Sequence, residues 1–239
     1  MDDRAILILA AGYGKRMQEY TANTPKPLLP IQQKPMLYYL LDEISDADYT
    51  GNVYINLHYL PKKMEAALQS YRKQINPAFK IKTLYEKKMY GAGGTLFRLC
   101  KEKREIKKVM LFSADALYTN FCKEIQKAWQ WKGDADAYLA LKKKEKRHTS
   151  APGFSFLHEV TKKEYSPIQY IRGGNYYYAG FSFFHADSVR QLPQPKKEYD
   201  CDLIEILKPL KLAGKITTNI ISVGTKQEYE NLLKKESLL

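Results

Sequence analysis

The sequence lacks long apolar runs, paired cysteines and metal-binding histidine spacings, and each absence excludes a class of protein. No apolar run approaches the ~18 residues that a membrane-spanning helix needs, so we expect no membrane partner. The three cysteines are scattered and form no CxxC pair, so we expect neither a zinc site nor a disulfide framework. The first residues, MDDRAILIL, include acids and no small-residue cleavage site, so we expect no signal peptide and a cytoplasmic protein.

Acidic residues are the scarcer charged class. The chain has 39 Lys and Arg against 26 Asp and Glu, a formal net charge of +13. The densest basic cluster, KKKEKR at 142–147, is interpreted as a solvated loop, because no aromatic residues for base stacking are interleaved with it. We therefore expect no nucleic-acid partner. Nucleic-acid binding stays open as an alternative based on charge, and an anionic small substrate accounts for the same charge.

Apolar strands alternate with helices up to residue 141. We predict strands at 5–9, 53–57, 81–85, 109–112 and 137–141, and helices at 36–44, 61–71, 95–102 and 121–131. Continuous apolar strands between helices predict an α/β fold with a parallel sheet covered on both faces. No linker composition interrupts the chain, so we expect one compact unit.

The pattern changes after residue 150. There we predict strands at 154–157, 168–171 and 176–184, several of them antiparallel, then a helix at 203–212 and a strand at 216–222. Thr225 with Glu228 forms a capping-box pattern, which predicts the start of a last helix.

A glycine-rich loop follows the first apolar run, but it lacks the two common phosphate-binding fingerprints. The dinucleotide fingerprint needs a third glycine where this chain has Met17, and the NTPase loop, Gly-x4-Gly-Lys-Ser/Thr, is absent. The loop reads Gly12-Tyr13-Gly14-Lys15-Arg16. Its glycines permit positive φ and close approach to phosphates, and Arg16 is a forked donor for phosphate oxygens.

Lys26 lies between Pro25 and Pro27, which stiffen the backbone around its ammonium. Ala10 and Ala11 are small enough for a base or ribose to lie against the backbone. Taken alone, the basic end of the glycine loop fits an ordinary strand-to-loop turn equally well. Combined with the segment at 24–27, it predicts a cradle for a polyphosphate and therefore a nucleotide-handling enzyme.

These two motifs together resemble the sugar-1-phosphate nucleotidyltransferases. That family has L-A-A-G-x-G-x-R-[ML] after its first strand, followed by T-P-K-[PA]-L-[LV]-P. The matching positions here are Leu9 to Gly12, Gly14, Arg16-Met17 and Thr24 to Pro30. More weakly, Asn56-Leu57-His58-Tyr59-Leu60 resembles short bacterial members that act on muramic acid, mannose or heptose 1-phosphates.

Weaker similarities extend the resemblance over nearly the whole chain. Glu86 to Leu96 resembles the family's E-P-x-G-T-A-G, Ser113-Ala114-Asp115 its G-D after the fourth strand, Tyr178-Ala179-Gly180 its N-A-G, and Val223-Gly224-Thr225 its D-[IV]-G-T.

The resemblance implies a fold and a reaction. The implied fold is a Rossmann-like, mostly parallel central sheet flanked by helices, with a smaller β-rich, acceptor-binding part in the C-terminal half. It implies a single domain, 1–239, in which 1–120 bind the NTP and 121–239 bind the acceptor. In the implied reaction, an oxygen of a sugar phosphate attacks the α-phosphorus of an NTP in line and pyrophosphate leaves, with Mg²⁺ as cofactor. The implied role is nucleotide-sugar synthesis for the cell envelope, by a monomer or homodimer.

The resemblance also assigns roles to residues. Arg16 is expected to contact the β and γ phosphates, Lys26 to bridge the α-phosphate and the sugar phosphate, and Asp115 to bind Mg²⁺. The expected nucleotide-binding residues are Leu9, Ala10, Ala11, Gly12, Gly14, Lys15, Glu86 and Gly91. The expected acceptor-binding residues are Gly153, Arg172, Ala179 and Gly180.

Two departures from the family pattern leave the activity open. Ser222 stands where the family has a second metal-binding aspartate, and a serine adds no negative charge. Arg172 supplies the charge of the lysine in the family's E-K-P segment, but no acid stands beside it. Glu159 and Glu164 are the nearest acids in that part of the sequence.

Three explanations of these departures remain open. Asp115 and the phosphates alone hold the metal, or an acid such as Asp202 or Glu205 supplies a further ligand, or the chain is a catalytically weak nucleotide-binding homologue with a regulatory role. Within the enzymes, cytidylyl transfer to a phosphorylated alcohol is the main alternative.

Overall fold

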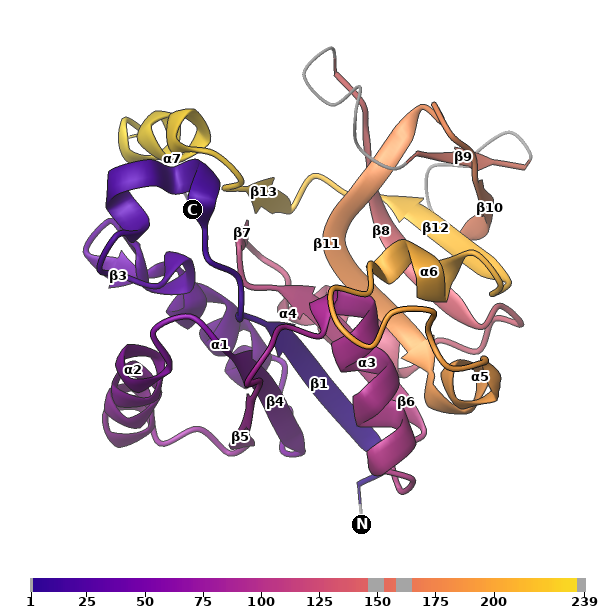
Figure 1. Ribbon diagram of the computed structural model, residues 1–239, viewed down its shortest axis with the longest axis horizontal. Helices are drawn as coiled ribbons and strands as arrows, with labels where there is room; N and C mark the ends of the chain where they lie inside the picture. The colour runs from indigo at the N-terminus through magenta and orange to yellow at the C-terminus, as the bar shows by residue number, and fades with distance from the viewer. Residues whose placement is uncertain (1, 146–152, 158–164, 236–239) are drawn as a thin grey trace. The chain divides into compact units, whose positions relative to one another are not determined.

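The computed structural model describes residues 2–145, 153–157 and 165–235 and has an α/β fold (Figure 1). A large mixed, mostly parallel central sheet is flanked by helices, as the sequence predicted. Within the described ranges the nine strands of this sheet follow the order β5-β4-β1-β6-β11-β8-β12-β10-β9. None of the helices in these ranges is long and apolar enough to cross a membrane.

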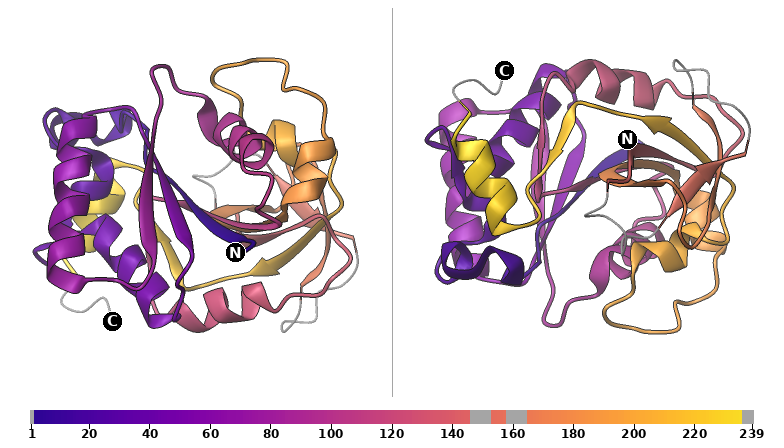
Figure 2. Two further views of the ribbon diagram at one scale, coloured as in Figure 1. Left: turned by 90° about the horizontal axis from the view of Figure 1, so that it is seen from below. Right: turned by 90° about the horizontal axis from the view of Figure 1, so that it is seen from above.

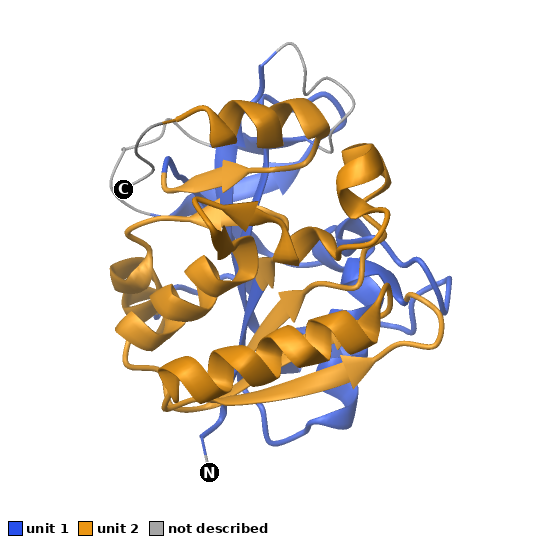
Figure 3. Cartoon of the chain, turned by 90° about the vertical axis from the view of Figure 1, so that its left-hand side faces the viewer, with its two compact units in different colours: residues 1–5, 90–111, 132–218 blue, residues 6–89, 112–131, 219–239 orange. Residues whose placement is uncertain are grey.

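The chain divides into two compact units, shown in different colours in Figure 3. Unit 1 comprises residues 1–5, 90–111 and 132–218, and unit 2 comprises residues 6–89, 112–131 and 219–239. Each unit therefore combines three separate stretches of sequence. The expected assignment of 1–120 to the NTP and 121–239 to the acceptor stays a prediction.

Unit 2 holds elements from the beginning, the middle and the end of the chain. They are β1 (Arg4–Leu9, whose first two residues belong to unit 1), η1 (Lys15–Thr21), η2 (Lys26–Leu28), β2 (Pro30–Ile31), β3 (Lys34–Pro35), α1 (Met36–Asp46), β4 (Asn52–Leu57), α2 (Pro61–Ile75), β5 (Lys80–Tyr85), β7 (Ala116–Tyr118), α4 (Cys122–Trp129), β13 (Ile220–Ser222) and α7 (Lys226–Leu233). β4 and β5 pair in parallel, as expected for strands joined by a helix.

Helix starts in unit 2 follow signals that the sequence carries. Pro61 begins α2, where its missing N–H would have no partner within the helix in any case. The capping box of α7 is confirmed: the Glu228 N–H donates to Thr225 Oγ1 at 3.2 Å, and the Thr225 N–H donates to Glu228 Oε2 at 3.0 Å.

A compact apolar cluster in unit 2 joins the two short 3₁₀ helices to the elements around them. Its buried members are Met17, Leu29, Ile31, Met36, Tyr39, Leu117, Val223, Tyr229 and Leu232. Met17 follows Arg16 in η1, and Val223 follows Ser222 at the end of β13. The cluster therefore anchors several segments that carry predicted site residues.

Unit 1 contains the β-rich C-terminal part that the sequence predicted. Its elements are α3 (Gly91–Glu102), β6 (Lys108–Ser113, whose last two residues belong to unit 2), β8 (Ala137–Lys143), β9 (Phe154–Phe156), β10 (Ser166–Tyr170), β11 (Tyr176–His185), α5 (Ala186–Gln191), α6 (Leu203–Leu207) and β12 (Leu212–Ile216). β11 runs antiparallel to β8 and β9, and β12 runs parallel to β8. Helix α3 packs with α5 and α6 (Figure 2).

Two predicted elements near the C-terminus were wrong. The helix expected at 203–212 ends at Leu207, because Pro209 has no N–H to continue it, and Leu212–Ile216 instead forms strand β12 between β8 and β10. The strand expected at 216–222 is also divided. β12 pairs within unit 1, whereas β13 pairs with β7 in unit 2.

Two other boundaries shift. The helix expected at 95–102 begins at Gly91, so the glycine segment at 91–94 forms its first turn. The basic cluster at 142–147 was expected as a loop, but its first two residues extend β8, because they pair with Tyr177 and Tyr176 of β11. Lys146 and Arg147 of that cluster lie outside the described residues.

Candidate active site

Lys26 is a buried cation bonded to a carboxylate. It begins the short helix η2, directly after Pro25, and only 8% of its side chain is exposed. Its Nζ lies 2.9 Å from Oδ2 of Asp115, which is 45% exposed. The proline-flanked backbone and this ion pair hold the ammonium in one place before any ligand arrives.

Asp115 lies where β6 ends and β7 begins, and the β7–β13 ladder brings Ser222 next to it. Ser222 pairs with Ala116, and the Val223 N–H donates to the Asp115 carbonyl at 3.0 Å. Ser222 is thus paired with the residue that follows Asp115, the predicted metal ligand.

The donor set beside Asp115 fits Mg²⁺ held by one carboxylate. The described residues contain no group of three or more His, Cys, Asp or Glu side chains placed to hold a metal. Mg²⁺ commonly takes one or two carboxylates and completes its shell with substrate phosphates and water. The half-exposed Asp115 carboxylate suits that mode.

Arg16 is exposed on η1 and reaches the same part of unit 2. A side-chain carbon built on Gly224 would lie 3.6 Å from Arg16 Nη2 and 3.6 Å from Ser222 Oγ. Of the three predicted catalytic residues, Lys26 and Asp115 are bonded to each other, and Arg16 lies near Gly224, which follows β13. Lys15, predicted to bind nucleotide, is exposed, and its Nζ lies 5.5 Å from the Tyr13 ring centroid.

The two glycines of the loop have different surroundings. Gly14 has φ of +66°, and a Cβ there would lie 2.9 Å from Thr21 Cγ2 and 3.2 Å from Lys26 Cβ. A side chain at this position would thus press on the residue that carries the buried cation. At Gly12 a Cβ would meet no atom within 4 Å, so the backbone of this exposed residue is open to a ligand.

The residues before the loop are tied to two neighbouring strands. The Leu9 carbonyl accepts from the Ala114 N–H at 3.1 Å. The Ala10 N–H donates to Asn56 Oδ1 at 2.6 Å, and Asn56 Nδ2 donates to the buried Glu86 carboxylate at 2.9 Å. Ala11, also buried, accepts from the Tyr59 N–H at 3.4 Å. Glu86 thus supports the loop through Asn56.

Gly91 begins helix α3 in unit 1, and its surroundings give it a packing role. Its φ is +76°, and a Cβ there would lie 2.4 Å from the Cys201 carbonyl oxygen. Cys201 donates its N–H to Tyr90 O at 2.8 Å and accepts from the Gly93 N–H at 3.0 Å. The requirement for glycine therefore follows from the segment around Cys201, and nucleotide binding by Gly91 stays a prediction.

The predicted acceptor residues form two neighbouring features of unit 1. A Cβ on Gly153 would lie 2.4 Å from the Gly174 nitrogen, and the Gly153 carbonyl accepts from the Ile171 N–H at 2.9 Å. Arg172 is exposed in the turn that follows β10. Gly153 therefore supports the Arg172 turn.

Ala179 and Gly180 lie at an irregularity of β11, where the register with β8 shifts between Tyr178 and Ser182. Gly180 has φ of +106°, a conformation that favours glycine. The two hydroxyls of Tyr178 and Ser182 bond across this bulge at 3.1 Å.

The acids considered as substitutes for the missing family acids lie in different parts of the chain. Asp202 caps α6, where its Oδ1 accepts from the Ile204 N–H at 3.0 Å, and Glu205 is exposed in the first turn of that helix. Glu159 and Glu164 lie outside the described residues.

Sequence reasoning missed the contacts that Tyr13 and His58 make with each other. The Tyr13 hydroxyl lies 2.7 Å from His58 Nε2, and His58 Nδ1 lies 2.8 Å from the Glu86 carbonyl oxygen. The segment Asn56 to Leu60 stood out in the sequence, but nothing there indicated that His58 contacts Tyr13.

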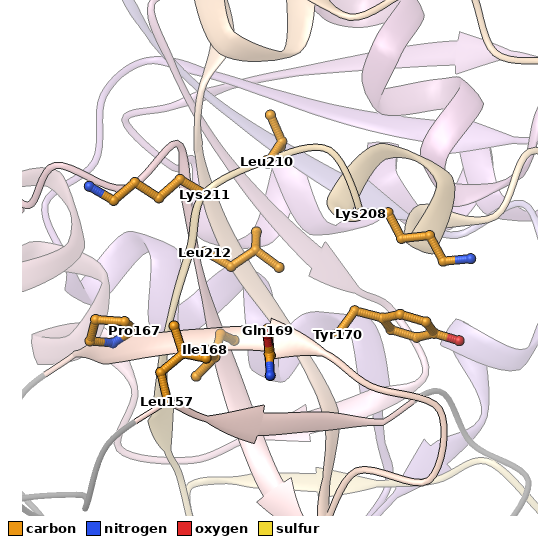
Figure 4. Close-up of a pocket in the computed structure, with 9 residues that line it drawn as sticks. All are labelled: Leu157, Pro167, Ile168, Gln169, Tyr170, Lys208, Leu210, Lys211 and Leu212. Carbon is orange, nitrogen blue, oxygen red and sulfur yellow. The ribbon is translucent and has the colours of Figure 1, made fainter.

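A separate cavity of about 420 Å³ lies in unit 1 and contains none of the predicted site residues (Figure 4). Its lining is Leu157, Pro167, Ile168, Gln169, Tyr170, Lys208, Leu210, Lys211 and Leu212. The two lysines point in opposite directions (Figure 4), and Lys211 is paired with Asp134. The remaining lining residues are mostly apolar.

The segment that contains the glycine loop, Lys26 and Asp115 matches a known family. The family model described as nucleotidyl transferase matches residues 5–153, more than half of the chain. This chain belongs to the nucleotidyl transferase family.

Curated relatives in this family match over short stretches. Mannose-1-phosphate guanyltransferase of Saccharomyces cerevisiae is 32% identical over 79 residues, which cover 32% of this chain and 22% of that protein. The bifunctional protein GlmU of Methanocaldococcus jannaschii is 36% identical over 58 residues, 24% of this chain and 14% of that protein. The matches thus cover less than a quarter of these relatives' own length.

Solved structures show the same fold over nearly the whole chain. A UDP-glucose pyrophosphorylase complexed with UDP-glucose superposes with a TM-score of 0.75 at 18% identity, covering 96% of this chain and 97% of that one. HddC from Yersinia pseudotuberculosis superposes with a TM-score of 0.71 at 18% identity, covering 98% and 99%. The nucleotidyl transferase fold therefore extends beyond the segment that the family model matches.

Proposed function

We propose that this nucleotidyl transferase moves a nucleotidyl group from an NTP to a sugar 1-phosphate and releases pyrophosphate. The observation that carries the proposal is the buried Lys26, bonded to Asp115 in the unit that also holds the open glycine loop. A buried, pre-placed cation in the same unit as the exposed Gly12 suits a polyanion that gains charge at its leaving group.

The relatives' names support a sugar 1-phosphate as acceptor. One curated relative is a mannose-1-phosphate guanyltransferase, and one solved neighbour is a UDP-glucose pyrophosphorylase. These names include different bases, so the proposal specifies an NTP and leaves the base open.

The chemistry requires no nucleophile from the protein. An oxygen of the sugar phosphate attacks the α-phosphorus in line, the bond to the bridging oxygen breaks, and pyrophosphate leaves with the electron pair. Lys26 would hold the α-phosphate and the attacking phosphate together, and Arg16 would bind the departing pyrophosphate. Catalysis is then positioning and charge neutralisation.

We include Mg²⁺ in the proposal, with Asp115 as its protein ligand. When bound, the ion would neutralise charge on the NTP phosphates. The residues around Asp115 would orient the site: the Ser222 hydroxyl can hydrogen-bond a water of the metal shell, and Lys26 can release Asp115 as phosphate takes the carboxylate's place beside its ammonium.

Ser222 favours one second candidate, a catalytically weak nucleotide-binding homologue with a regulatory role. The β7–β13 register pairs this serine with Ala116, the residue after Asp115, and a hydroxyl replaces the negative charge expected there. Cytidylyl transfer to a phosphorylated alcohol would use the same phosphate-binding residues and is an outcome of the test below.

The wider context is also proposed. We place the chain in the cytoplasm, in nucleotide-sugar synthesis for the cell envelope, as a monomer or homodimer without nucleic-acid or membrane partners. The scattered cysteines and the small anionic substrates motivate this context.

A pyrophosphate-release assay tests the function. The four common NTPs are combined with several sugar 1-phosphates and with phosphorylated alcohols in the presence of Mg²⁺. We expect release with an NTP and a sugar 1-phosphate. Release only with a phosphorylated alcohol would move the function to the cytidylyltransferase alternative, and NTP binding without any release would favour the weak homologue.

A further inference from the structure

The end of β4 and the segment that follows it contact the glycine loop and the two residues before it. Asn56 Oδ1 accepts from the Ala10 N–H at 2.6 Å, the Tyr59 N–H donates to the Ala11 carbonyl at 3.4 Å, and His58 Nε2 meets the Tyr13 hydroxyl at 2.7 Å. The first two contacts hold the base of the glycine loop. The third holds its tip.

The hydrogen-bond directions around His58 follow from its partners. A backbone carbonyl only accepts, so His58 Nδ1, 2.8 Å from the Glu86 carbonyl oxygen, carries the proton and donates. In the neutral ring Nε2 is then the acceptor, and the Tyr13 hydroxyl donates to it. Because Glu86 follows β5 directly, the chain of contacts ties the glycine loop to the end of that strand.

Tyr13 is well placed to restrain the loop. It lies between Gly12 and Gly14, whose backbones have the greatest conformational freedom, and it is the one residue of these three with a side chain. Its ring meets the His58 ring edge-on, with centroids 5.2 Å apart, and lies tilted against Tyr59 at 5.5 Å. With Gly12 open to solvent, a side-chain anchor at Tyr13 sets where the loop backbone points.

We propose that Tyr13 and His58 form a positioning pair for the nucleoside triphosphate. Resting on the proposed function, the inference is that their hydroxyl–imidazole bond pre-orders the Gly12–Gly14 backbone for the phosphates. Pre-ordering lowers the entropy lost on binding, so the pair acts on phosphate affinity. The pair does not touch the reacting atoms. We therefore expect kcat and the preference among NTP bases to be independent of it.

A double-mutant cycle isolates this bond. Tyr13→Phe removes the hydroxyl and keeps the ring contacts. His58→Asn keeps an amide donor near the Glu86 carbonyl and removes the Nε2 acceptor. Tyr38→Phe is the matched control, because its hydroxyl donates to the Ala67 carbonyl at 2.7 Å within the same unit, away from the glycine loop.

The measurements are calorimetric Kd values for ATP, GTP, CTP, UTP and inorganic tripolyphosphate with Mg²⁺, the kcat and KM of pyrophosphate release, and thermal unfolding. We expect each loop variant to weaken the binding of tripolyphosphate and of the preferred NTP by about fivefold to tenfold. The double variant should bind no more weakly than either single variant. The kcat should stay within about twofold, and the unfolding midpoint should match that of Tyr38→Phe.

Several results would refute the proposed positioning role of Tyr13 and His58. Unchanged Kd values, effects that add in the double variant, or a kcat loss at constant Kd would each do so. Failure of the proposed function looks different: wild-type protein that binds an NTP but releases no pyrophosphate refutes the transferase and leaves the Kd cycle valid. Wild-type protein that binds none of the NTPs refutes both.

Discussion

Lys26 in unit 2 and Arg172 in unit 1 are both predicted to bind phosphate, yet the chain holds them in different ways. Lys26 is 8% exposed at its side chain and is bonded to Asp115 at 2.9 Å, whereas Arg172 is exposed in a turn. A Cβ built on Gly14 would lie 3.2 Å from Lys26 Cβ, so the glycine loop approaches Lys26 closely. Around Arg172, Gly173 leaves open space.

The difference indicates what each region contributes. A buried cation is already ordered, so its interaction energy is available to the reacting phosphates. An exposed arginine must be ordered when its ligand arrives, so part of its interaction energy is lost to that ordering. The contrast predicts that the first region acts mainly on kcat and the second mainly on KM.

Lys26→Ala should give the largest effect. Removing the ammonium should lower kcat by about 10²–10³-fold, the scale seen when one charge-stabilising group is lost. The fold should survive, because the half-exposed Asp115 can be hydrated once its partner is gone. Steady-state pyrophosphate release and thermal unfolding measure the two effects. Lys34→Ala, which removes a partly exposed ion pair with Asp42 in the same unit, is the control. Wild-type turnover in Lys26→Ala would refute its role.

Gly14→Ala should rank second, through stability and binding together. The substitution combines a positive φ with a Cβ 2.9 Å from Thr21 Cγ2, and we expect a loss of about 2–3 kcal/mol. Gly173→Ala is the matched control, since its φ is +86° but nothing lies within 4 Å of a built Cβ, so about 1 kcal/mol is expected there. Denaturant unfolding measures both variants, and equal losses would show that crowding at Gly14 is unimportant.

Arg172→Ala should raise the KM for the sugar 1-phosphate by about tenfold, the loss of one charge-assisted contact. The kcat and the Kd for the NTP should stay near wild type, since the exposed turn supports neither. Initial rates over a range of acceptor concentrations give the split. A fall in kcat at constant KM would abolish the proposed contrast between the two regions.

Ser222→Asp should give the smallest change, and it tests whether position 222 affects metal binding in unit 2. A second carboxylate next to Asp115 should tighten divalent-metal binding several-fold, measured by titration with Mn²⁺ as a spectroscopic probe for Mg²⁺. Asn219→Asp adds the same charge to the exposed residue just before β13 and is the control. Equal tightening in both variants would mean that general charge, rather than the position of Ser222, governs metal affinity.

Much of the fold was predictable because its signals are local. The strands ending at Leu9, Leu57 and Tyr85 were visible as apolar runs, and α7 was visible from its capping box. Strand β12, which begins where the helix expected at 203–212 should end, could not be predicted. Its pairing with β8 and β10 is a long-range contact and overrides local helix propensity.

The candidate site divides in the same way. The glycine loop and the proline-flanked Lys26 predicted the residues proposed to bind phosphate, but they did not indicate which residues contact them. Nothing in the sequence near Tyr13 indicates His58, and Gly91 gives no sign of the Cys201 segment that requires it to be glycine.

The sequence by itself determined the family and the order of most elements and predicted the phosphate-binding groups, because periodicity, turn residues and motif spacing are properties of neighbouring residues. Only the tertiary structure decided that Lys26 is buried against Asp115, 89 residues away, that Ser222 pairs with the residue after that aspartate, and that His58 contacts Tyr13. These contacts join segments distant in sequence. They arise only when burial of the apolar cores has set the strand order and register.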